Sequence, residues 1–351
     1  MRIAQVAPLI ESVPPRLYGG TERIVSYLTE ELVRQGHDVT LFASGDSQTS
    51  ANLVASVPQA LRLDAGIADY LPYAVLQLEH VRQRAHEFDV IHFHSELLHL
   101  PLARGLLGRR AVTTLHGRID LGSYRAILNE FSDMPLVSIS NDQRKPVSHA
   151  NWLRTIHHGL PSAVCPFHPE PRGDYVAFLG RMSPEKRPDR AIEIAARAGV
   201  RLKMAAKVDE MDREYFRSKI EPLLAQPHVE YVGEISEREK PEFLGNARAL
   251  LFPVDWPEPF GLVMIEAMSC GTPCIAWRAG SVPEVVDHGV TGWIVDSIDG
   301  AVQAVERAAL LDRRTVRARF EQRFSAQRMA KDYLRVYEQI ARDMKGRIAA
   351  A

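Results

Sequence analysis

The stretch MRIAQVAPLIESVPPRLYGGTERIVSYLTEELVRQGHDVTLFA, residues 1–43, decides the fold expected for this chain. Apolar runs at Arg2–Ala7 and Asp38–Ala43 predict two β-strands. Between them, Thr21–Gln35 carries apolar side chains at helical spacing, and Gly36 provides a stop signal for the helix. A strand, a helix and a second strand in this order predict a βαβ unit with parallel strands.

The same alternation of strand and helix patterns continues along the chain. Further strands are expected in the first half at Asp89–Phe93, Ala111–Leu115, Leu136–Ser140 and Thr155–His157. Strands are expected in the second half at Tyr175–Leu179, Arg201–Ala205, Val229–Val232, Ala249–Pro253 and Pro273–Trp277. Helices are expected there at Pro188–Ala198, Asp212–Leu224, Glu237–Asn246, Phe260–Cys270, Asp299–Leu311 and Ala326–Arg342.

A proline-rich break divides this alternation into two halves. The run LPSAVCPFHPEPRGD, residues 160–174, holds four prolines and shows no periodicity, which is typical of a linker. We therefore predict an α/β fold with two Rossmann-like, doubly wound parallel-sheet domains that face each other across a cleft. The expected boundaries are residues 1–160 plus a terminal helix at 326–345, a linker at 161–174, and a second domain at 175–325.

Bulk composition excludes several classes of protein. The chain has 351 residues, 46% of them hydrophobic and 25% charged, with a formal net charge of −1, so no overall field favours nucleic acid. No apolar run approaches the roughly 18 residues of a transmembrane helix, and the start lacks the pattern of a signal peptide. Three cysteines form no disulfide framework or paired zinc motif, so a reduced, cytoplasmic protein is expected.

The segment EPFGLVMIE, Glu258–Glu266, carries the strongest functional signal. Its two carboxylates are eight residues apart, which is about 12 Å of rise in a helix. They are too distant to share a proton, so we interpret them as two separate anchors. Phe260 and Gly261 between them lie where a helix is expected to begin, and a helix N-terminus favours a bound anion.

Three further features are expected at the carboxyl ends of strands. The Gly19-Gly20 turn lets the backbone approach a ligand closely, although it could be only a flexible connection. Arg181 and Lys186 follow the first strand of the second half and could bind a diphosphate, or they could belong to a solvated basic loop. His116 ends the strand AVTTLHG.

A second group of histidines lies in the segment HFHSELLH. His92 and His94 share one face of a strand, and His99 follows them, so a metal site is conceivable. Packing at a strand end and on a helix surface is the favoured interpretation. Nothing else in the sequence completes a convincing metal site.

Together these features resemble the family 4 retaining glycosyltransferases of the two-domain GT-B fold, over nearly the whole chain. The motifs that carry the resemblance are YGGTE at 18–22, RQGHDV at 34–39, TLHG at 114–117, GR at 180–181 with Lys186, VGE at 232–234, and EPFGLVMIE. The ordered set is specific, whereas two glutamates at this spacing alone would be a weak signal.

The resemblance implies a role for each matching residue. Arg181 and Lys186 are expected to neutralise the donor diphosphate, Glu266 to bind ribose hydroxyls, and Glu258 to hold the transferred sugar. The implied catalytic residues are Glu258, Arg181, Lys186 and His116, which matches the family's N-domain histidine beside the sugar. The remaining implied donor contacts are Gly19, Gly20, Gly233, Ile235 and the backbone amides of Phe260, Gly261 and Leu262, and Glu234 could add to them. Attack on the front face of the sugar is implied, with no metal ion or other cofactor beyond the nucleotide-diphosphate sugar.

Two departures from the family pattern bear on the substrate rather than on the reaction type. His158-Gly159 stands where many members have Asn-Gly, and Ala205–Asp209 replaces a glycine-rich turn. Lys207 in that segment could contact a phosphate or the acceptor, but a surface lysine is slightly favoured. A UDP-sugar is expected ahead of GDP- or ADP-sugars, and a small molecule or glycan acceptor ahead of a lipid. A sugar-nucleotide 2-epimerase and a non-catalytic binding protein are the alternatives.

Overall fold

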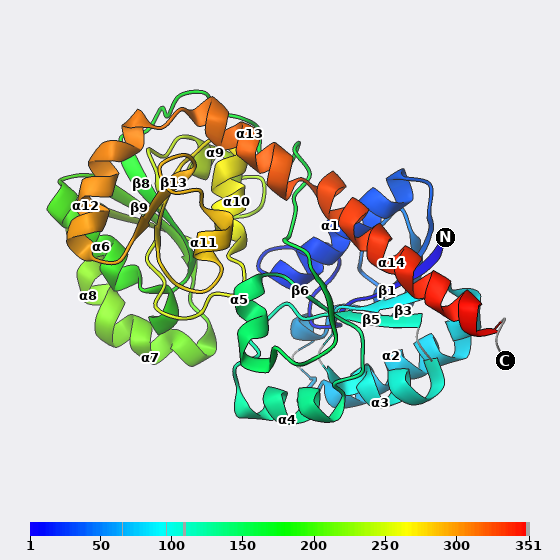
Figure 1. The fold of residues 1–351 in the computed structure, drawn as a ribbon. Coiled ribbons are helices and arrows are strands. Elements are labelled where there is room, and N and C mark those ends of the chain that lie inside the picture. Colours follow the sequence, from blue (N-terminus) through cyan, green and yellow to red (C-terminus); the bar gives the residue numbers. More distant parts are fainter. Residues whose placement is uncertain (65, 96, 108–109, 349–351) are drawn as a thin grey trace. The chain divides into compact units, whose positions relative to one another are not determined.

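The computed structural model describes residues 1–64, 66–95, 97–107 and 110–348. The chain forms two compact units, each of which is an α/β domain with one parallel sheet (Figure 1). Unit 1 comprises residues 1–159 and the C-terminal helix α14 (Ala326–Ile348), and unit 2 comprises residues 160–325.

Unit 1 contains, within its described residues, a seven-stranded sheet in the order β3-β2-β1-β4-β5-β6-β7. Its strands are β1 (Arg2–Val6), β2 (Asp38–Ser44), β3 (Asn52–Val57), β4 (Val90–Phe93), β5 (Ala111–Thr114), β6 (Leu136–Ser138) and β7 (Trp152–Thr155). The order of strands reverses between β1 and β4. In a doubly wound sheet, ligands bind outside the carboxyl ends of the strands at this reversal.

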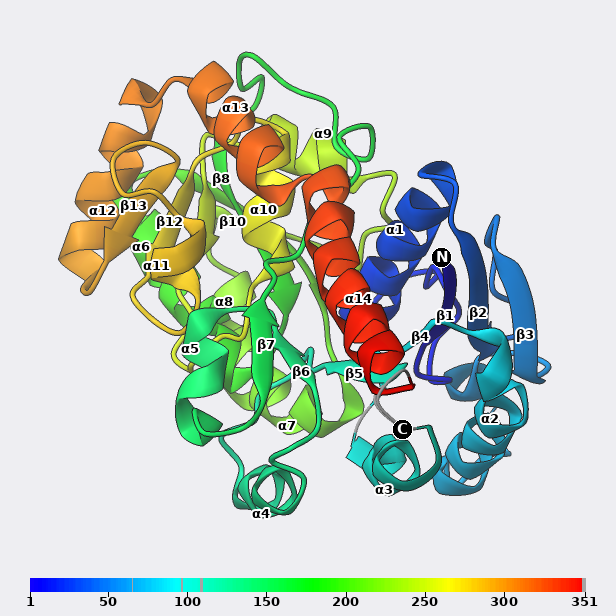
Figure 2. The ribbon, with the colours of Figure 1, turned by 45° about the vertical axis from the view of Figure 1, so that its right-hand side comes forward.

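Helices cover both faces of this sheet. Helices α1 and α14 pack against each other on one face, while α2 and α4 belong to the hydrophobic cluster on the other (Figure 2). The helices of unit 1 besides α14 are α1 (Gly20–Arg34), α2 (Leu71–Arg84), α3 (Leu100–Leu102), α4 (Gly122–Glu130) and α5 (Asn141–Arg144).

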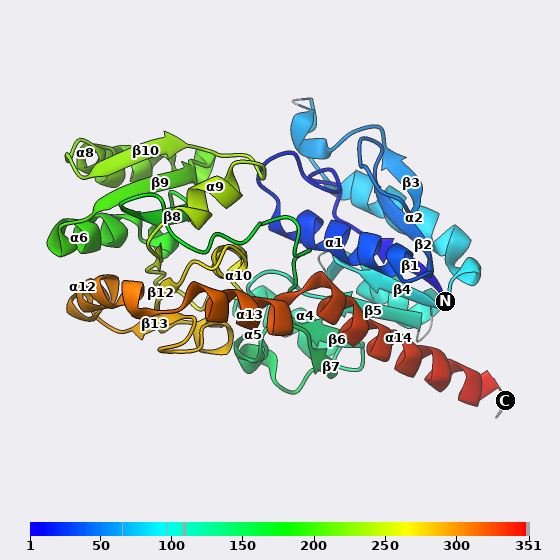
Figure 3. The ribbon, with the colours of Figure 1, turned by 90° about the horizontal axis from the view of Figure 1, so that it is seen from above.

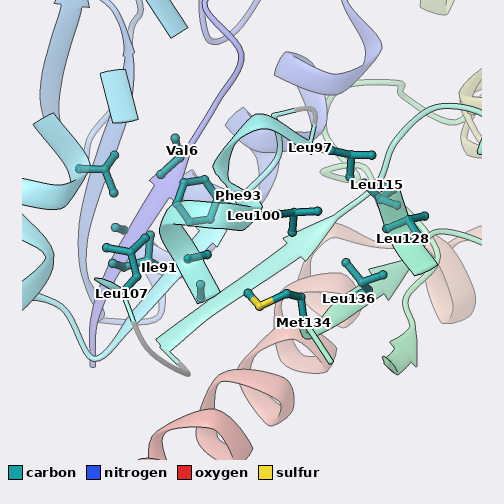
Figure 4. Packing of buried hydrophobic residues seen from close by; sticks show 14 of the residues in the cluster. Val6, Ile91, Phe93, Leu97, Leu100, Leu107, Leu115, Leu128, Met134 and Leu136 are labelled. Carbon is teal, nitrogen blue, oxygen red and sulfur yellow. The ribbon is translucent and has the colours of Figure 1, made fainter. Parts of the chain in front are cut away.

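Strand β4 shows how the sheet divides side chains between its two faces. Ile91 and Phe93 join a buried hydrophobic cluster on the α2 and α4 face (Figure 4). His92 and His94 alternate with them and therefore point to the α14 face. Burial of each large apolar side chain contributes roughly 1.5–3 kcal/mol, so this cluster is a main source of stability for unit 1.

Helix α14 returns the end of the chain to unit 1. It is the amphipathic tail expected from the sequence, extended to Ile348, and its apolar stripe is buried. The buried side chains of that stripe are Met329, Tyr333, Val336, Tyr337 and Ile340. Among the described residues, no helix combines the length and apolar content needed to cross a membrane.

Unit 2 contains, in the part of the chain described, a six-stranded sheet in the order β10-β9-β8-β11-β12-β13. Its strands are β8 (Tyr175–Arg181), β9 (Arg201–Lys207), β10 (Val229–Gly233), β11 (Leu250–Phe252), β12 (Cys274–Trp277) and β13 (Gly292–Val295). Its helices are α6 (Pro188–Ala198), α7 (Arg213–Tyr215), α8 (Glu221–Leu224), α9 (Lys240–Gly245), α10 (Leu262–Ser269), α11 (Val282–Val285), α12 (Ile298–Arg307) and α13 (Arg313–Phe324). Helices α6 and α12 pack on one face, and α9, α10 and α13 on the other (Figure 3).

The segment expected as a linker, residues 161–174, belongs to unit 2 and packs against it. Cys165 is buried, and its carbonyl accepts a hydrogen bond of 3.0 Å from the Ser269 hydroxyl. The backbone N–H of His168 donates to the carbonyl of Cys270, and that of Gly173 donates to Asn246, each at 3.0 Å. The prolines of residues 161–174 exclude regular secondary structure, but the segment still packs against the rest of unit 2.

Several elements differ from the sequence expectation. The edge strands β3 and β13 and helix α13 were not predicted, because an edge strand can be exposed or short, and α13 is rich in arginine. Strand β7 ends at Thr155, where a strand was expected to begin. The helix expected at Asp212–Leu224 is divided by a π-helical turn, Phe216–Ile220.

Candidate functional site

The candidate residues of unit 2 lie at the carboxyl ends of its parallel strands. Arg181 ends β8, Lys207 ends β9 and Gly233 ends β10. The chain leaves β11 at Phe252 and runs through Glu258 to α10. Parallel strands end at the same edge, so these residues share one edge of the sheet. The order of strands reverses between β8 and β11, where doubly wound sheets bind ligands.

Arg181 is surrounded by carboxylates that the sequence does not single out. Its guanidinium group lies 2.5 Å from Glu185, 3.5 Å from Asp212 and 3.6 Å from Asp209. Lys207 pairs with Arg181 in the strand register, and its ammonium group lies 2.9 Å from Asp209. An anionic ligand of Arg181 therefore competes with these carboxylates for the guanidinium group.

Lys186 and Glu258 form a direct ion pair although 72 residues separate them. Lys186 ends a short 3₁₀ helix that follows β8, and Glu258 lies in the loop after β11. The Glu258 carboxylate is almost fully buried and accepts a hydrogen bond of 2.8 Å from the indole N–H of Trp256. The Lys186 ammonium group lies 5.1 Å from the centroid of that indole ring. The negative charge of the buried Glu258 carboxylate is thus paired with a cation, and its position is fixed by two contacts.

A tight turn connects Glu258 to α10. Gly261 is the residue before the helix and has a φ of +78°, which only glycine adopts without strain. A Cβ atom at this position would lie 2.9 Å from the Phe252 ring. Helix α10 begins at Leu262, two residues after the predicted start at Phe260. The N–H groups at the start of a helix favour an anion.

The loop between β12 and α11 supports this turn. The Ser281 hydroxyl donates a hydrogen bond of 2.8 Å to the carbonyl of Phe260, and its backbone N–H donates one of 2.9 Å to the carbonyl of Glu258. Gly280 is required beside it, because a Cβ there would lie 2.3 Å from the Glu258 backbone. The backbone amides from Phe260 to Leu262 therefore belong to a rigid segment.

Glu266 lies within α10, is almost fully buried, and has a different lysine partner. The ammonium group of Lys240 is 2.8 Å from its carboxylate and also contacts Glu237. Burial alone lowers the pKa of Lys240, but the two carboxylates outweigh it, and the net shift of this pKa is upward. Glu258 and Glu266 are therefore two independently paired carboxylates.

The end of β10 and the loop after it contain three further candidates of unit 2. Gly233 has a φ of +78° and interrupts the register between β10 and β9. The Glu234 side chain is exposed and that of Ile235 is half-buried. Their contact with a nucleotide base stays a prediction.

In unit 1, the glycine-rich turn leads directly into α1. The helix begins at Gly20 rather than Thr21, and Gly19 precedes it. A Cβ atom on Gly19 would lie 2.7 Å from the Pro15 side chain, so no larger residue fits without movement. Glu22 in the first turn is buried, and desolvation raises its pKa to about 7.

His116 follows β5 at the carboxyl edge of the unit 1 sheet. Its Nε2 atom lies 2.9 Å from Nδ1 of His94, and its ring stacks on that of His158 at a centroid distance of 5.2 Å. Burial lowers the pKa of His116 to about 3, so the ring is neutral near pH 7. His158, whose role the sequence leaves open, is therefore a packing partner of His116.

The histidines of HFHSELLH do not gather into one cluster. His99 stacks on Phe93 at 4.0 Å and lies 2.6 Å from the Thr113 hydroxyl, away from His92 and His94. Within the described ranges of the chain, no group of three or more His, Cys, Asp or Glu residues is arranged to hold a metal ion.

The sequence gives only a weak signal for the residues that pair with Glu258 and Glu266. Trp256 lies two residues before Glu258, and Lys240 lies three residues after Glu237, so local spacing offers a weak signal for each. The pairing of Lys240 with Glu266 has no such signal, because it depends on how α9 packs against α10.

Two family models match the chain. The model "Glycosyl transferases group 1" matches residues 168–325, and the model "Glycosyltransferase Family 4" matches residues 18–136. The first match lies within unit 2 and the second within unit 1.

Individual relatives match over nearly the whole chain. N-acetyl-alpha-D-glucosaminyl L-malate synthase of Bacillus anthracis is 24% identical, with coverage of 93% of this chain and 96% of that protein. Phosphatidyl-myo-inositol mannosyltransferase of Mycobacterium leprae is 26% identical, with 97% of both chains covered. The Anabaena protein HepE, solved in complex with UDP and glucose, has a TM-score of 0.74 at 20% identity, over 97% of this chain and 100% of HepE. The predicted GT-B fold is confirmed.

The buried pair of Lys240 and Glu266 predicts a stability effect. Lys240→Met should lower the free energy of unfolding of unit 2 by about 2–4 kcal/mol, because it leaves a buried carboxylate without its cation. Urea denaturation followed by circular dichroism measures this loss. The matched control is Lys203→Met, whose 3.2 Å ion pair with Glu230 is more exposed and should be worth less than about 1 kcal/mol. If both variants lost the same free energy of unfolding, the buried pair of Lys240 and Glu266 would not have the predicted effect on stability.

The raised pKa of Glu22 predicts a pH dependence of stability. The folded state keeps the Glu22 proton up to about pH 7, whereas the unfolded chain releases it near the ordinary value of 4.5. Below pH 4.5 the Glu22 side chain is protonated in both states and does not lower the free energy of unfolding. As the pH rises from 4.5 to 7, the free energy of unfolding falls by on the order of 3 kcal/mol, because the folded state holds a proton that the unfolded chain releases. Urea denaturation at pH 5 and pH 8 should show a smaller loss in Glu22→Gln than in the wild type. Identical pH dependence in both proteins would disprove the assignment.

Proposed function

This chain belongs to the family 4 glycosyltransferases, enzymes of the GT-B fold that transfer sugars from nucleotide sugars, and we propose that its donor is a UDP-hexose. The proposed reaction transfers the hexosyl unit to an acceptor hydroxyl with retention of configuration and forms an α-glycosidic bond. The solved HepE complex, which contains UDP, supports this choice of nucleotide.

The observation that carries the proposal is the group of charges where the strand order of unit 2 reverses. Arg181 and Lys186 follow β8, and Glu258 approaches Lys186 from the loop after β11. Two cations at this edge suit a diphosphate, and a fixed carboxylate beside them suits sugar hydroxyls.

We assign the remaining donor contacts around this group. Glu258 and the backbone amides of Phe260, Gly261 and Leu262 hold the transferred sugar, and Glu266 binds the ribose hydroxyls. The segment Gly233–Ile235 frames the base, and Lys207 is a possible further phosphate contact. In unit 1, the Gly19-Gly20 turn and His116 are the proposed contributors, and the acceptor is a small molecule or glycan rather than a lipid.

The proposed chemistry needs stabilisation of a leaving group. The bond from C1 of the sugar to the β-phosphate oxygen breaks, and its electron pair remains on the phosphate. Arg181, Lys186 and the first N–H groups of α10 stabilise that charge as it develops. The acceptor oxygen bonds to C1 from the same face, and its proton passes to the departing phosphate. These protein charges take the place of a divalent cation in the proposal.

Release of UDP in the presence of candidate acceptors tests this function. Purified protein is incubated with UDP-, GDP- and ADP-sugars and an acceptor panel, with and without EDTA. Acceptor-dependent release of UDP that persists in EDTA supports the proposal. Interconversion of the donor sugar would instead indicate a 2-epimerase, and binding without turnover a non-catalytic protein. A loss of release in EDTA would contradict the metal-independent form of the proposal.

Removal of the Arg181 guanidinium group should slow transfer strongly. Arg181→Ala should lose more than about 100-fold in kcat, on the order of 3 kcal/mol, because one charge contact to the leaving group disappears. Arg181→Lys is the matched control that keeps the charge but not the fork, and it should lose less. Near-normal turnover by Arg181→Ala would remove this residue from the mechanism.

Removal of the Glu266 carboxylate should act on nucleotide binding. Glu266→Gln keeps the shape of the side chain but weakens acceptance of hydrogen bonds from ribose hydroxyls, so calorimetry should show UDP affinity reduced by about 10-fold or more. Unchanged UDP affinity would show that the ribose assignment is wrong.

A further inference from the structure

A continuous chain of hydrogen bonds runs through the α14 face of the unit 1 sheet. From His116 Nε2 it passes to His94 Nδ1 at 2.9 Å, and from His94 Nε2 to Gln5 Oε1 at 2.7 Å. Gln5 Nε2 then donates to the Tyr337 hydroxyl at 3.0 Å, and that hydroxyl lies 2.7 Å from His92 Nδ1.

The chain ends at a second tyrosine of α14. His92 Nε2 lies 2.7 Å from the Thr114 hydroxyl, which lies 3.0 Å from the hydroxyl of Tyr333. All the residues linked behind His116 are at most 3% exposed. Water therefore cannot replace these hydrogen bonds, and each one restricts the protonation of its neighbour.

The orientation of Gln5 sets the direction of the hydrogen bonds. Its carboxamide oxygen can only accept, so His94 carries its proton on Nε2 and leaves Nδ1 as an acceptor. His116 must then donate from Nε2 to His94. Desolvation holds the pKa of His94 well below its ordinary value, so the ring stays neutral and has one proton to place.

This direction leaves an acceptor at the carboxyl edge of the sheet. With its proton on Nε2, His116 has a lone pair on Nδ1, and this buried atom has no hydrogen-bond partner among the described residues. The reverse direction would need the Gln5 carboxamide to turn over and would leave a buried N–H group without an acceptor. Among backbone groups, an orphaned buried N–H is rarer than an acceptor without a partner, and we expect the same of an imidazole N–H.

We infer that Gln5 and His94 are positioning residues that hold His116 as its neutral Nε2–H tautomer, so that Nδ1 accepts a hydrogen bond from a substrate hydroxyl. This inference rests on the proposed function for the identity of the substrate. On this view, the buried hydrogen-bond network does more than hold α14 against the sheet. It also determines which ring nitrogen of His116 is the acceptor.

Nitrogen-15 NMR of the histidine rings in the ligand-free protein tests the inference. The wild type should show His116 protonated on Nε2. Gln5→Met removes the acceptor that orients His94 and should shift His116 toward protonation on Nδ1. The matched control is Tyr333→Phe, which removes the far end of the network but leaves the links from Tyr337 through Gln5 and His94 to His116. It should retain the wild-type tautomer.

Kinetics distinguishes this role from a purely structural one. Gln5→Met should lower kcat/KM about 10-fold, the loss expected for one hydrogen bond, while Tyr333→Phe stays close to the wild type even if its Tm falls. If Gln5→Met does not fold, two variants of His94 replace it in the test. His94→Asn keeps an acceptor near the position of Nδ1 and should therefore retain more activity than His94→Leu.

The outcomes separate the inference from the proposed function. A wild-type His116 protonated on Nδ1, or equal effects of Gln5→Met and Tyr333→Phe on the tautomer and on kcat/KM, would overturn the inference. Absence of transfer by the wild type with every donor would overturn the proposed function, and the NMR result would still decide the tautomer.

Discussion

Both units depend on one constraint: their strands pair in parallel, and the order of the strands in the sheet reverses once. It brings the ends of β8, β9, β10 and β11 to one edge, and it places the reversal between β8 and β11. Loops that leave these strands must diverge at that point. Lys186 and Glu258 can therefore meet across 72 residues of chain, and the indole of Trp256 fixes both.

Charge is balanced locally throughout this edge of unit 2. Arg181 is surrounded by Glu185, Asp209 and Asp212, and Lys186 is paired with Glu258. A ligand that carries negative phosphates and neutral hydroxyls has to exchange these internal pairs for its own. The side chains that would bind such a ligand are already oriented and partly desolvated before it arrives.

The sequence predicts the parts of the fold and of the candidate site that depend on local patterns. Apolar periodicity located α1, α6 and α14, and strand ends located Arg181 and His116. The pairing of Lys240 with Glu266 and that of Gln5 with Tyr337 could not be predicted, because they depend on packing between segments 26 and 332 residues apart. Strand β3 was missed because it is largely exposed, and β13 because it is only four residues long.

The position of α14 also has a consequence for the order of folding during synthesis. Unit 2 is one continuous segment, residues 160–325, and is complete as soon as that segment has left the ribosome. Unit 1 begins first but needs Tyr333 and Tyr337 to cover Gln5 and His92. The part of its sheet that α14 covers therefore stays open until residues 326–348 have been synthesised. Unit 1, whose first residues are made before those of unit 2, therefore completes its fold after unit 2.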